Sequence, residues 1–216
     1  MRGNYTRELD RLSAKVQEMG TAIGKAVLKT KDAVDHMDVK MAQELIDGDD
    51  VFDQMNRDIE QECLNVVVTQ APVAGDWRRL ASIMRMISDL ERIADHCSDI
   101  AEYLLKLSKS DAVELPVNFD NMFQLVYEML DATVKAFVSL DTEAAIAAAN
   151  RDDIQDDYFD TTVEELTSLM KGDPAHVEQY VDYLMIAKYL ERMADHTTNL
   201  AEWIAYLAKG ELESIQ

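Results

Sequence analysis

LERIADH (residues 90–96) returns as LERMADH (residues 190–196), at an offset of 100 residues from Glu91 to Glu191. The likeness extends beyond this heptapeptide, because eight of the thirteen positions from 90 to 102 are identical to those from 190 to 202. Chance identity at about one position in twenty would give less than one match. The chain is therefore predicted to be a tandem duplication.

The apolar residues around this stretch recur at steps of three and four, which is the periodicity of helices in a bundle. Alternating patterns that would indicate strands are missing. Pro72, Pro116 and Pro174 lie where the periodicity pauses, and Asp38 and Asp141 have the position of helix N-caps. Together these marks predict helices at about residues 4–37, 39–70, 76–109, 118–140, 142–171 and 174–209.

Short connections between long helices force consecutive helices to pack antiparallel. We therefore predict an all-α fold of two tandem, pseudo-symmetric antiparallel three-helix bundles. The first domain is expected at residues 1–112 and the second at residues 113–216.

Acidic side chains line one edge of the repeated helix. At 100° per residue, Glu91, Asp95 and Glu102 fall within about 40° of one another. The second half repeats this stripe with Glu191, Asp195 and Glu202. The preceding helix of each half has acids at i, i+4 and i+11, namely Asp49, Asp53 and Glu60, and then Asp153, Asp157 and Glu164.

Like charges four residues apart destabilise a helix by a few tenths of a kcal/mol, so something is expected to relieve them. Divalent and trivalent cations bind carboxylate oxygens, and acids from two antiparallel helices can converge on such an ion. Salt bridges from Arg92 and Arg192, or simple solvation of the charged face, are the alternatives. His96 and His196 point about 100° further round the helix and are expected to be partly exposed, not ligands.

No catalytic arrangement is recognisable. The chain has no Glu-x-x-His pair of the kind that holds iron in carboxylate oxidases, no Gly-rich phosphate loop, no Gly-x-Ser-x-Gly and no His-Glu-x-x-His. We therefore predict that the chain is not an enzyme. A metal-storage or metal-dependent helical-bundle protein is the alternative.

The charge is strongly negative, with 21 Lys and Arg against 42 Asp and Glu, a formal net charge of −21. Such a field repels nucleic acid and anionic lipid and attracts cations and basic protein surfaces. Cys63 and Cys97 are expected to be buried free thiols. Residues 1–20 carry charges throughout, and no later stretch is apolar for long enough to span a membrane. We expect a cytoplasmic protein that meets membranes only through partners.

The chain resembles the PhoU family of regulators of phosphate transport, whose signature is a Glu/Asp-x-x-x-Asp motif in tandem duplication. The motif reads Glu91 to Asp95 and Glu191 to Asp195. The turn at residues 48–53 and the Gln-Ala-Pro at residues 70–72 are also similar to the family pattern. The resemblance covers nearly the full chain.

This resemblance implies carboxylate motifs that bind iron, zinc, manganese or magnesium ions, in clusters. The candidate metal ligands are Glu91, Asp95, Glu191, Asp195, Asp49, Asp53, Asp153 and Asp157. The second half departs from the family pattern, because Arg151 and Gln155 interrupt it and Asn199 replaces Asp99. Equivalence of the two metal sites therefore stays open.

The resemblance also implies a protein, often a homodimer, that acts through partners. The expected partners are the ATPase subunit of the phosphate ATP-binding cassette transporter and the phosphate-sensing histidine kinase. Through them the family is thought to hold down transport and the phosphate-starvation genes when phosphate is plentiful.

Overall fold

The computed structural model describes residues 2–70, 74–111, 113–210 and 215. Every regular element within these residues is a helix. The first half contains α1 (Arg2–His36), α2 (Val39–Asp47), α3 (Asp50–Gln70) and α4 (Ala74–Leu107). The second half contains α5 (Phe119–Ser139), α6 (Thr142–Ala149), α7 (Asp152–Gly172), the short 3₁₀ helix η1 (Pro174–His176) and α8 (Val177–Lys209). The predicted all-α fold is confirmed.

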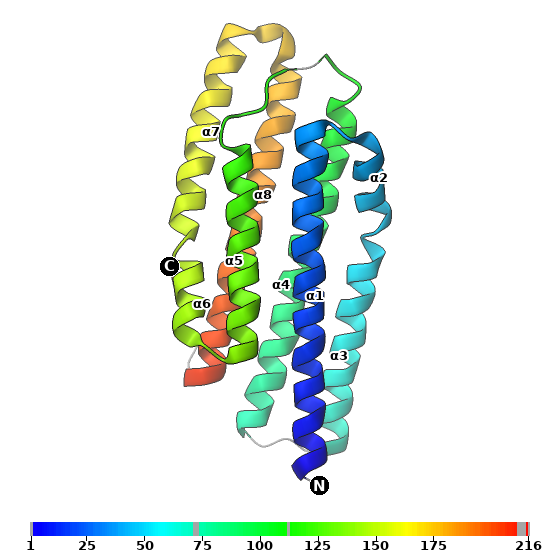
Figure 1. The fold of residues 1–216 in the computed structure, drawn as a ribbon. Coiled ribbons are helices and arrows are strands. Elements are labelled where there is room, and N and C mark those ends of the chain that lie inside the picture. Colours follow the sequence, from blue (N-terminus) through cyan, green and yellow to red (C-terminus); the bar gives the residue numbers. More distant parts are fainter. Residues whose placement is uncertain (1, 71–73, 112, 211–214, 216) are drawn as a thin grey trace.

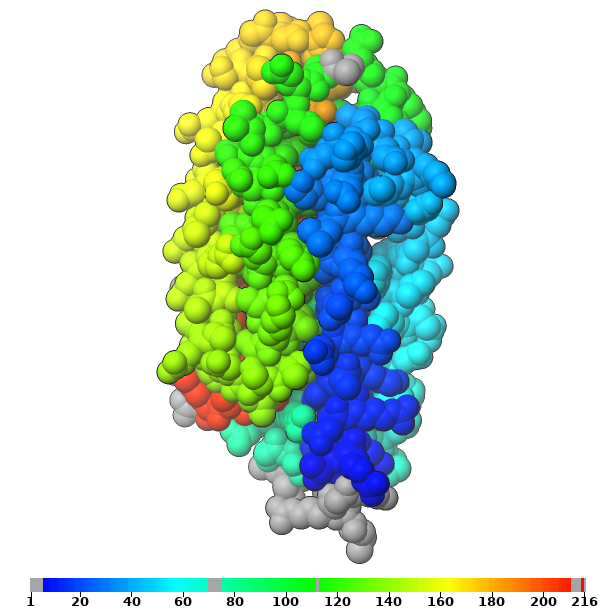
Figure 2. Space-filling view, in the orientation of Figure 1, coloured from blue at the N-terminus to red at the C-terminus, as the bar shows by residue number. Residues whose placement is uncertain are grey.

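The two halves lie side by side along their long axes (Figure 1). Each half is an elongated antiparallel bundle in which a pair of consecutive helices, α2 with α3 or α6 with α7, takes the place of a single second helix. The halves meet where α4 packs against α8 and α1 against α5. Figure 2 shows the α1 and α5 surfaces in contact along much of this face.

The hydrophobic core is continuous across both halves. Small residues of the repeated helices, including Ala94, Ala101, Ala194 and Ala201, are buried, which allows neighbouring helices to approach closely. Cys63 and Cys97 are buried free thiols, as predicted. The predicted domain boundary falls between α4 and α5, and residue 112 lies outside the described residues. No helix in the described part of the chain is long and apolar enough to cross a bilayer.

The prediction of one continuous helix at 39–70, and of another at 142–171, is wrong. The first breaks between α2 and α3, where the amides of Asp49, Val51 and Phe52 bond to carbonyls three residues back instead of four. The second breaks between α6 and α7 in the same way, through the amides of Arg151 and Ile154. Gly48 keeps right-handed helical angles (φ −89°, ψ −7°) at the joint, so the apolar periodicity continues through the break and hides it.

The joints also fix how the second helices of the two halves correspond. Asp49 and Arg151 bond to Ile46 and Ala148 respectively, so the offset at the joint is 102 residues. The α3 and α7 helices have the same length and start at Asp50 and Asp152, which continues this offset. Asp49 and Asp53 therefore correspond to Arg151 and Gln155, and not to Asp153 and Asp157.

Candidate metal centre

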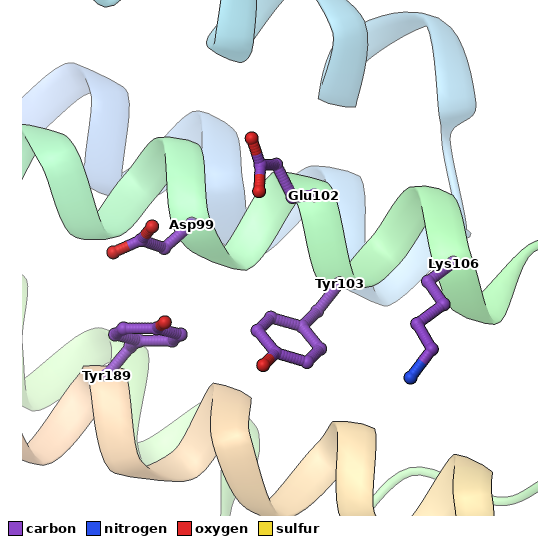
Figure 3. Close-up of a pocket in the computed structure, with 5 residues that line it drawn as sticks. All are labelled: Asp99, Glu102, Tyr103, Lys106 and Tyr189. Carbon is purple, nitrogen blue, oxygen red and sulfur yellow. The ribbon is translucent and has the colours of Figure 1, made fainter.

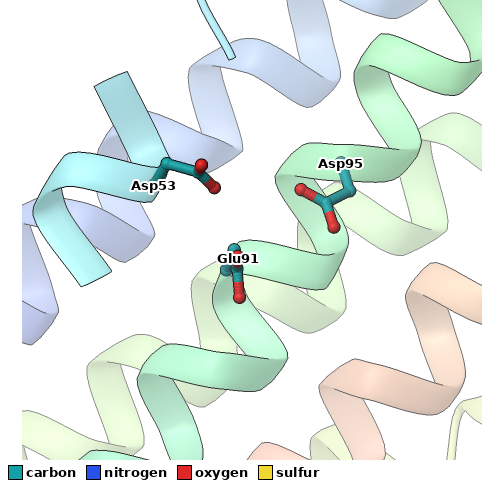
Figure 4. Close-up of side chains that lie close together, drawn as sticks. All are labelled: Asp53, Glu91 and Asp95. Atoms are coloured by element: carbon teal, nitrogen blue, oxygen red, sulfur yellow. The ribbon is translucent and has the colours of Figure 1, made fainter. Parts of the chain in front are cut away.

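Three carboxylates converge between α3 and α4 (Figure 4). Asp53 comes from the first turn of α3, and Glu91 and Asp95 come from successive turns of α4. One oxygen from each of the three lies within 4.8 Å of the others. The joint before α3 places Asp53 over α4. Asp49, at the joint between α2 and α3, is a fourth predicted ligand close to this group, since the charges of Asp95 and Asp53 act on it.

The three carboxylates are partly buried, and their neighbours only partly satisfy them. The Asn56 Nδ2 donates a hydrogen bond to Glu91 Oε2 at 3.1 Å. The Arg57 Nη1 lies 3.2 Å from Asp53 Oδ2, and the Arg92 Nη1 lies 2.8 Å from Asp95 Oδ2. Both guanidinium side chains are 57% exposed, so solvent screens these ion pairs. Arg92 therefore relieves one acid of the group, and Glu91 has a neutral amide as its hydrogen-bond donor.

Burial and the repulsion of neighbouring carboxylates disfavour the charged forms of Asp49, Glu91 and Asp95. The pKa of Asp49 is raised to about 6, first by burial and then by Asp95 and Asp53. Burial, followed by the charge of Asp95, raises the pKa of Glu91. Burial also raises the pKa of Asp95, although Arg92 partly opposes this rise. A cation bound among the acids would reverse these shifts, because it stabilises every carboxylate in its ionised form.

This set of donors fits a metal ion that prefers oxygen. Carboxylates in mono- or bidentate modes are the usual protein ligands of magnesium, manganese and calcium, and they also bind iron and zinc. The fit concerns the kind of donor atoms and their convergence.

The second half brings together a different group. The acids that act on Asp195 are Glu191 and Asp156, and Lys188 acts on it with the opposite sign. Asp153 and Asp156 line a depression of about 300 Å³ beside the α6–α7 joint, and Asp157 is exposed on α7. Among the described residues, only the group in the first half places three potential ligand atoms within 4.8 Å.

Sequence reasoning missed Asn56, Asp156 and Lys188. Asn56 follows Asp53 by three residues and Lys188 precedes Glu191 by three, so helical spacing places both beside acids that were already candidates. His96 was expected to be partly exposed, yet its side chain is only 8% exposed. The reason is that α8 covers it, with the rings of Tyr189 and His196 at 5.1 and 5.7 Å.

A second cavity, of about 290 Å³, lies between α4 and α8 (Figure 3). Asp99, Glu102, Tyr103 and Lys106 line it from α4, and Tyr189 lines it from α8. Asp99 accepts a hydrogen bond from His96 Nδ1 at 3.0 Å when that nitrogen is protonated. Lys106 reaches Asp182 at 2.6 Å, which links the two halves.

These features define a class of protein: a duplicated helical bundle with a cluster of three carboxylates on the helix pair of one repeat. The PhoU domain profile matches the chain twice, at residues 16–104 and 119–204. The chain belongs to the PhoU family.

Relatives and solved structures agree over nearly the whole chain. Phosphate-specific transport system accessory protein PhoU homologs from Burkholderia sp. and Aquifex aeolicus are each 32% identical, over 95% of this chain and 89% and 93% of their own lengths. The crystal structure of the phosphate transport system regulatory protein PhoU from Streptococcus pneumoniae has a TM-score of 0.90 at 31% identity, covering 97% of this chain and 99% of that one. The crystal structure of PhoU from Pseudomonas aeruginosa has a TM-score of 0.91 at 29% identity, covering 96% and 100%.

Proposed function

We propose that this chain is a non-enzymatic, cytoplasmic regulator of phosphate homeostasis. It acts on the high-affinity phosphate transporter and restrains the phosphate-starvation response. The observation that carries this proposal is the match of the PhoU domain to both repeats. The names of relatives, which include a phosphate transport system regulatory protein and phosphate-specific transport accessory proteins, support the phosphate role.

The partners in this proposal are the ATPase subunit of the phosphate transporter and the phosphate-sensing histidine kinase. The net charge of −21 favours docking on basic surfaces of such partners. A homodimer is the proposed working form, as the family resemblance implies.

The metal part of the proposal concerns the first repeat. Asp53, Glu91 and Asp95 hold a divalent or trivalent cation, with Asp49 beside them. The convergence of three partly buried carboxylates supports this assignment. A cation held by these acids would neutralise them, and the acids of α3 and α4 would then hold the two helices in one arrangement for docking.

A pull-down from phosphate-replete cells tests the partner proposal. The tagged chain should enrich the transporter's ATPase subunit or the histidine kinase over a tag-only control. The variant Glu91→Gln/Asp95→Asn, which keeps side-chain size and removes the charges, should enrich less of both. Recovery of neither partner with the parent chain, under conditions where both are expressed, contradicts the proposed function.

A metal measurement separates the two parts of the proposal. The purified parent should contain more metal than Glu91→Gln/Asp95→Asn by elemental analysis. Equal trace contents would overturn the metal part and leave the regulatory part to the pull-down.

A further inference from the structure

In the second repeat, the side chain of Lys188 contacts the carboxylate of Glu191. The Lys188 Nζ is 2.7 Å from Glu191 Oε1 and 2.7 Å from Glu191 Oε2, so it contacts both oxygens of the carboxylate. The Glu191 side chain is only 15% exposed. The Phe159 ring, on α7, lies 5.2 Å from the same ammonium group, within the range of a cation–π interaction. This ammonium therefore lies between the two helices, α7 and α8, that correspond to the metal-binding pair of the first repeat.

The first repeat has no lysine at this place. At the offset of 100 residues, Ser88 corresponds to Lys188 and Glu91 to Glu191. Glu91 accepts a hydrogen bond from the neutral Asn56 amide instead. Arg57 and Arg92 do pair with Asp53 and Asp95. Each contacts a single carboxylate oxygen, and its side chain is 57% exposed, against 43% for Lys188. Arg92 also acts on Glu91 through its charge, but its hydrogen bond goes to Asp95.

Fewer acidic side chains surround the Glu-x-x-x-Asp motif in the second repeat than in the first. The first repeat carries Asp49, Asp53 and Asp99 around its Glu-x-x-x-Asp motif, and all three act within one electrostatic group. At the offsets that the structure sets, their counterparts are Arg151, Gln155 and Asn199. Arg151 forms an ion pair with Glu128, with 2.6 Å between Nη2 and Oε2. Glu191, Asp195 and Asp152 keep their charge at positions that correspond to Glu91, Asp95 and Asp50, and Asp156 is an additional acid near Asp195.

Gln155 stands where the first repeat has the carboxylate of Asp53. It corresponds to Asp53, is fully buried, and neither its Oε1 nor its Nε2 has a hydrogen-bond partner among the described residues. A neutral amide in place of an acid lowers the affinity of a carboxylate site for a hard cation.

We propose that Lys188 is the built-in cation of the second repeat, so that this repeat is neutralised from within and the chain binds metal at the first repeat alone. A lysine ammonium is a compact point charge on a flexible stem, which suits it to the position of a bound ion. The two repeats thus perform different tasks: the α3–α4 pair depends on the supply of metal, and the α7–α8 pair keeps its arrangement without it. This inference rests on the proposed function for the metal at the first repeat.

Metal stoichiometry on the full chain tests the inference. Protein stripped with a chelator is titrated with Mn²⁺ by calorimetry, and retained metal is measured after gel filtration. The parent should bind one equivalent per chain, and Glu191→Gln/Asp195→Asn should bind the same. The double variant Lys188→Ser/Gln155→Asp, which restores the first-repeat residues, should bind a second equivalent.

The matched control is Lys188→Arg/Gln155→Asp, which carries the same new acid but keeps a cation over Glu191. It should remain at one equivalent. Two equivalents in the parent, with one lost in Glu191→Gln/Asp195→Asn, would overturn the inference and leave the metal at the first repeat intact. An unchanged stoichiometry in Lys188→Ser/Gln155→Asp, confirmed as folded by circular dichroism, would also overturn it. No metal in the parent and one equivalent in that variant would uphold Lys188 as the cation and contradict the metal part of the proposed function.

Discussion

Asp49 makes the metal-free protein sensitive to pH. Its pKa is raised to about 6, so the folded chain holds this proton more tightly than the unfolded chain does. Stability therefore falls as the pH rises from about 4 to about 6, and the full penalty remains above that range. In the presence of a chelator, we expect Asp49→Asn to stabilise the protein at pH 7.5 by about 1 kcal/mol, after allowance for solvent screening, and to have little effect at pH 4.5.

Thermal unfolding at a series of pH values measures this difference. Glu60→Gln, at an exposed acid of α3, controls for the loss of one negative charge. An equal stabilisation by Asp49→Asn at pH 4.5 and 7.5 would contradict the role of its ionisation.

Gln155 offers a second prediction at the scale of one residue. Its amide is fully buried and without a hydrogen-bond partner among the described residues, so the folded state carries an uncompensated desolvation of polar atoms. Gln155→Met keeps the length of the side chain and removes both polar atoms. We expect it to raise the free energy of unfolding by about 1 kcal/mol in urea titrations. A loss of stability would show that the amide is satisfied in solution.

Individual site residues were predictable where one helix determines their spacing. Glu91 and Asp95 share a face because they are four residues apart on α4. Asp53 was a candidate from its own helix, but its meeting with Glu91 depends on the angle at the α2–α3 joint. The spacing of three residues could have indicated the pairing of Lys188 with Glu191, but its place over Phe159 depends on how α7 packs on α8.

At the scale of elements, two aspartates determine where α2 and α6 begin. The Asp38 Oδ1 accepts a hydrogen bond from the Met41 amide at 3.0 Å, and the Asp141 Oδ1 accepts one from the Ala144 amide at 3.0 Å. We expect Asp38→Ala and Asp141→Ala each to reduce the free energy of unfolding by about 1 kcal/mol. Asp38→Asn and Asp141→Asn should retain most of the stability, because asparagine caps equally well. Equal losses in the Ala and Asn variants would contradict the capping role.

These caps were predicted from the sequence, whereas the joints that follow them were not. Asp38 and Asp141 stand at the end of one apolar pattern and the start of another, which is a local signal. At Gly48 and Asn150 the backbone stays in the right-handed helical region, so the apolar periodicity runs through both joints. The turn residues at 48–53 were noted as a family feature but were not used to divide the predicted helix. The joint also explains why the second helices of the repeats were aligned incorrectly from the sequence. Pairing Asp49 with Asp153 and Asp53 with Asp157 uses an offset of 104 residues, whereas the structure gives an offset of 102.

At the scale of the whole molecule, Gly20 sets the distance between the repeats on the α1–α5 side. A Cβ atom at Gly20 would lie 2.5 Å from Val134 Cγ2, and the branched valine has little freedom to move away. We expect Gly20→Ala to cost about 1–3 kcal/mol through overpacking, despite the higher helix propensity of alanine. Gly75→Ala is the control, because a Cβ there meets nothing within 4 Å. Chemical denaturation compares the two, and a stabilised Gly20→Ala would contradict this contact.

The duplication was readable from LERIADH and LERMADH alone, and so were the all-α fold and the two bundles. How the bundles face each other was not, since the contacts of α4 with α8 and of Gly20 with Val134 join residues about 100 positions apart. The functional asymmetry that we propose for the repeats belongs to this scale as well. It rests on a few differences, chiefly Gln155 and Lys188, within two helix pairs of nearly equal length.

The most direct test of the account is phosphate uptake by phosphate-replete cells in which this chain is deleted and then restored. Deletion should raise uptake and expression of the starvation genes, and the parent chain should bring both back to the restrained level. Glu91→Gln/Asp95→Asn should restore restraint only in part, whereas Glu60→Gln, at an exposed acid of α3, should act like the parent. Unchanged uptake and gene expression after deletion would contradict the central claim that this chain regulates phosphate homeostasis.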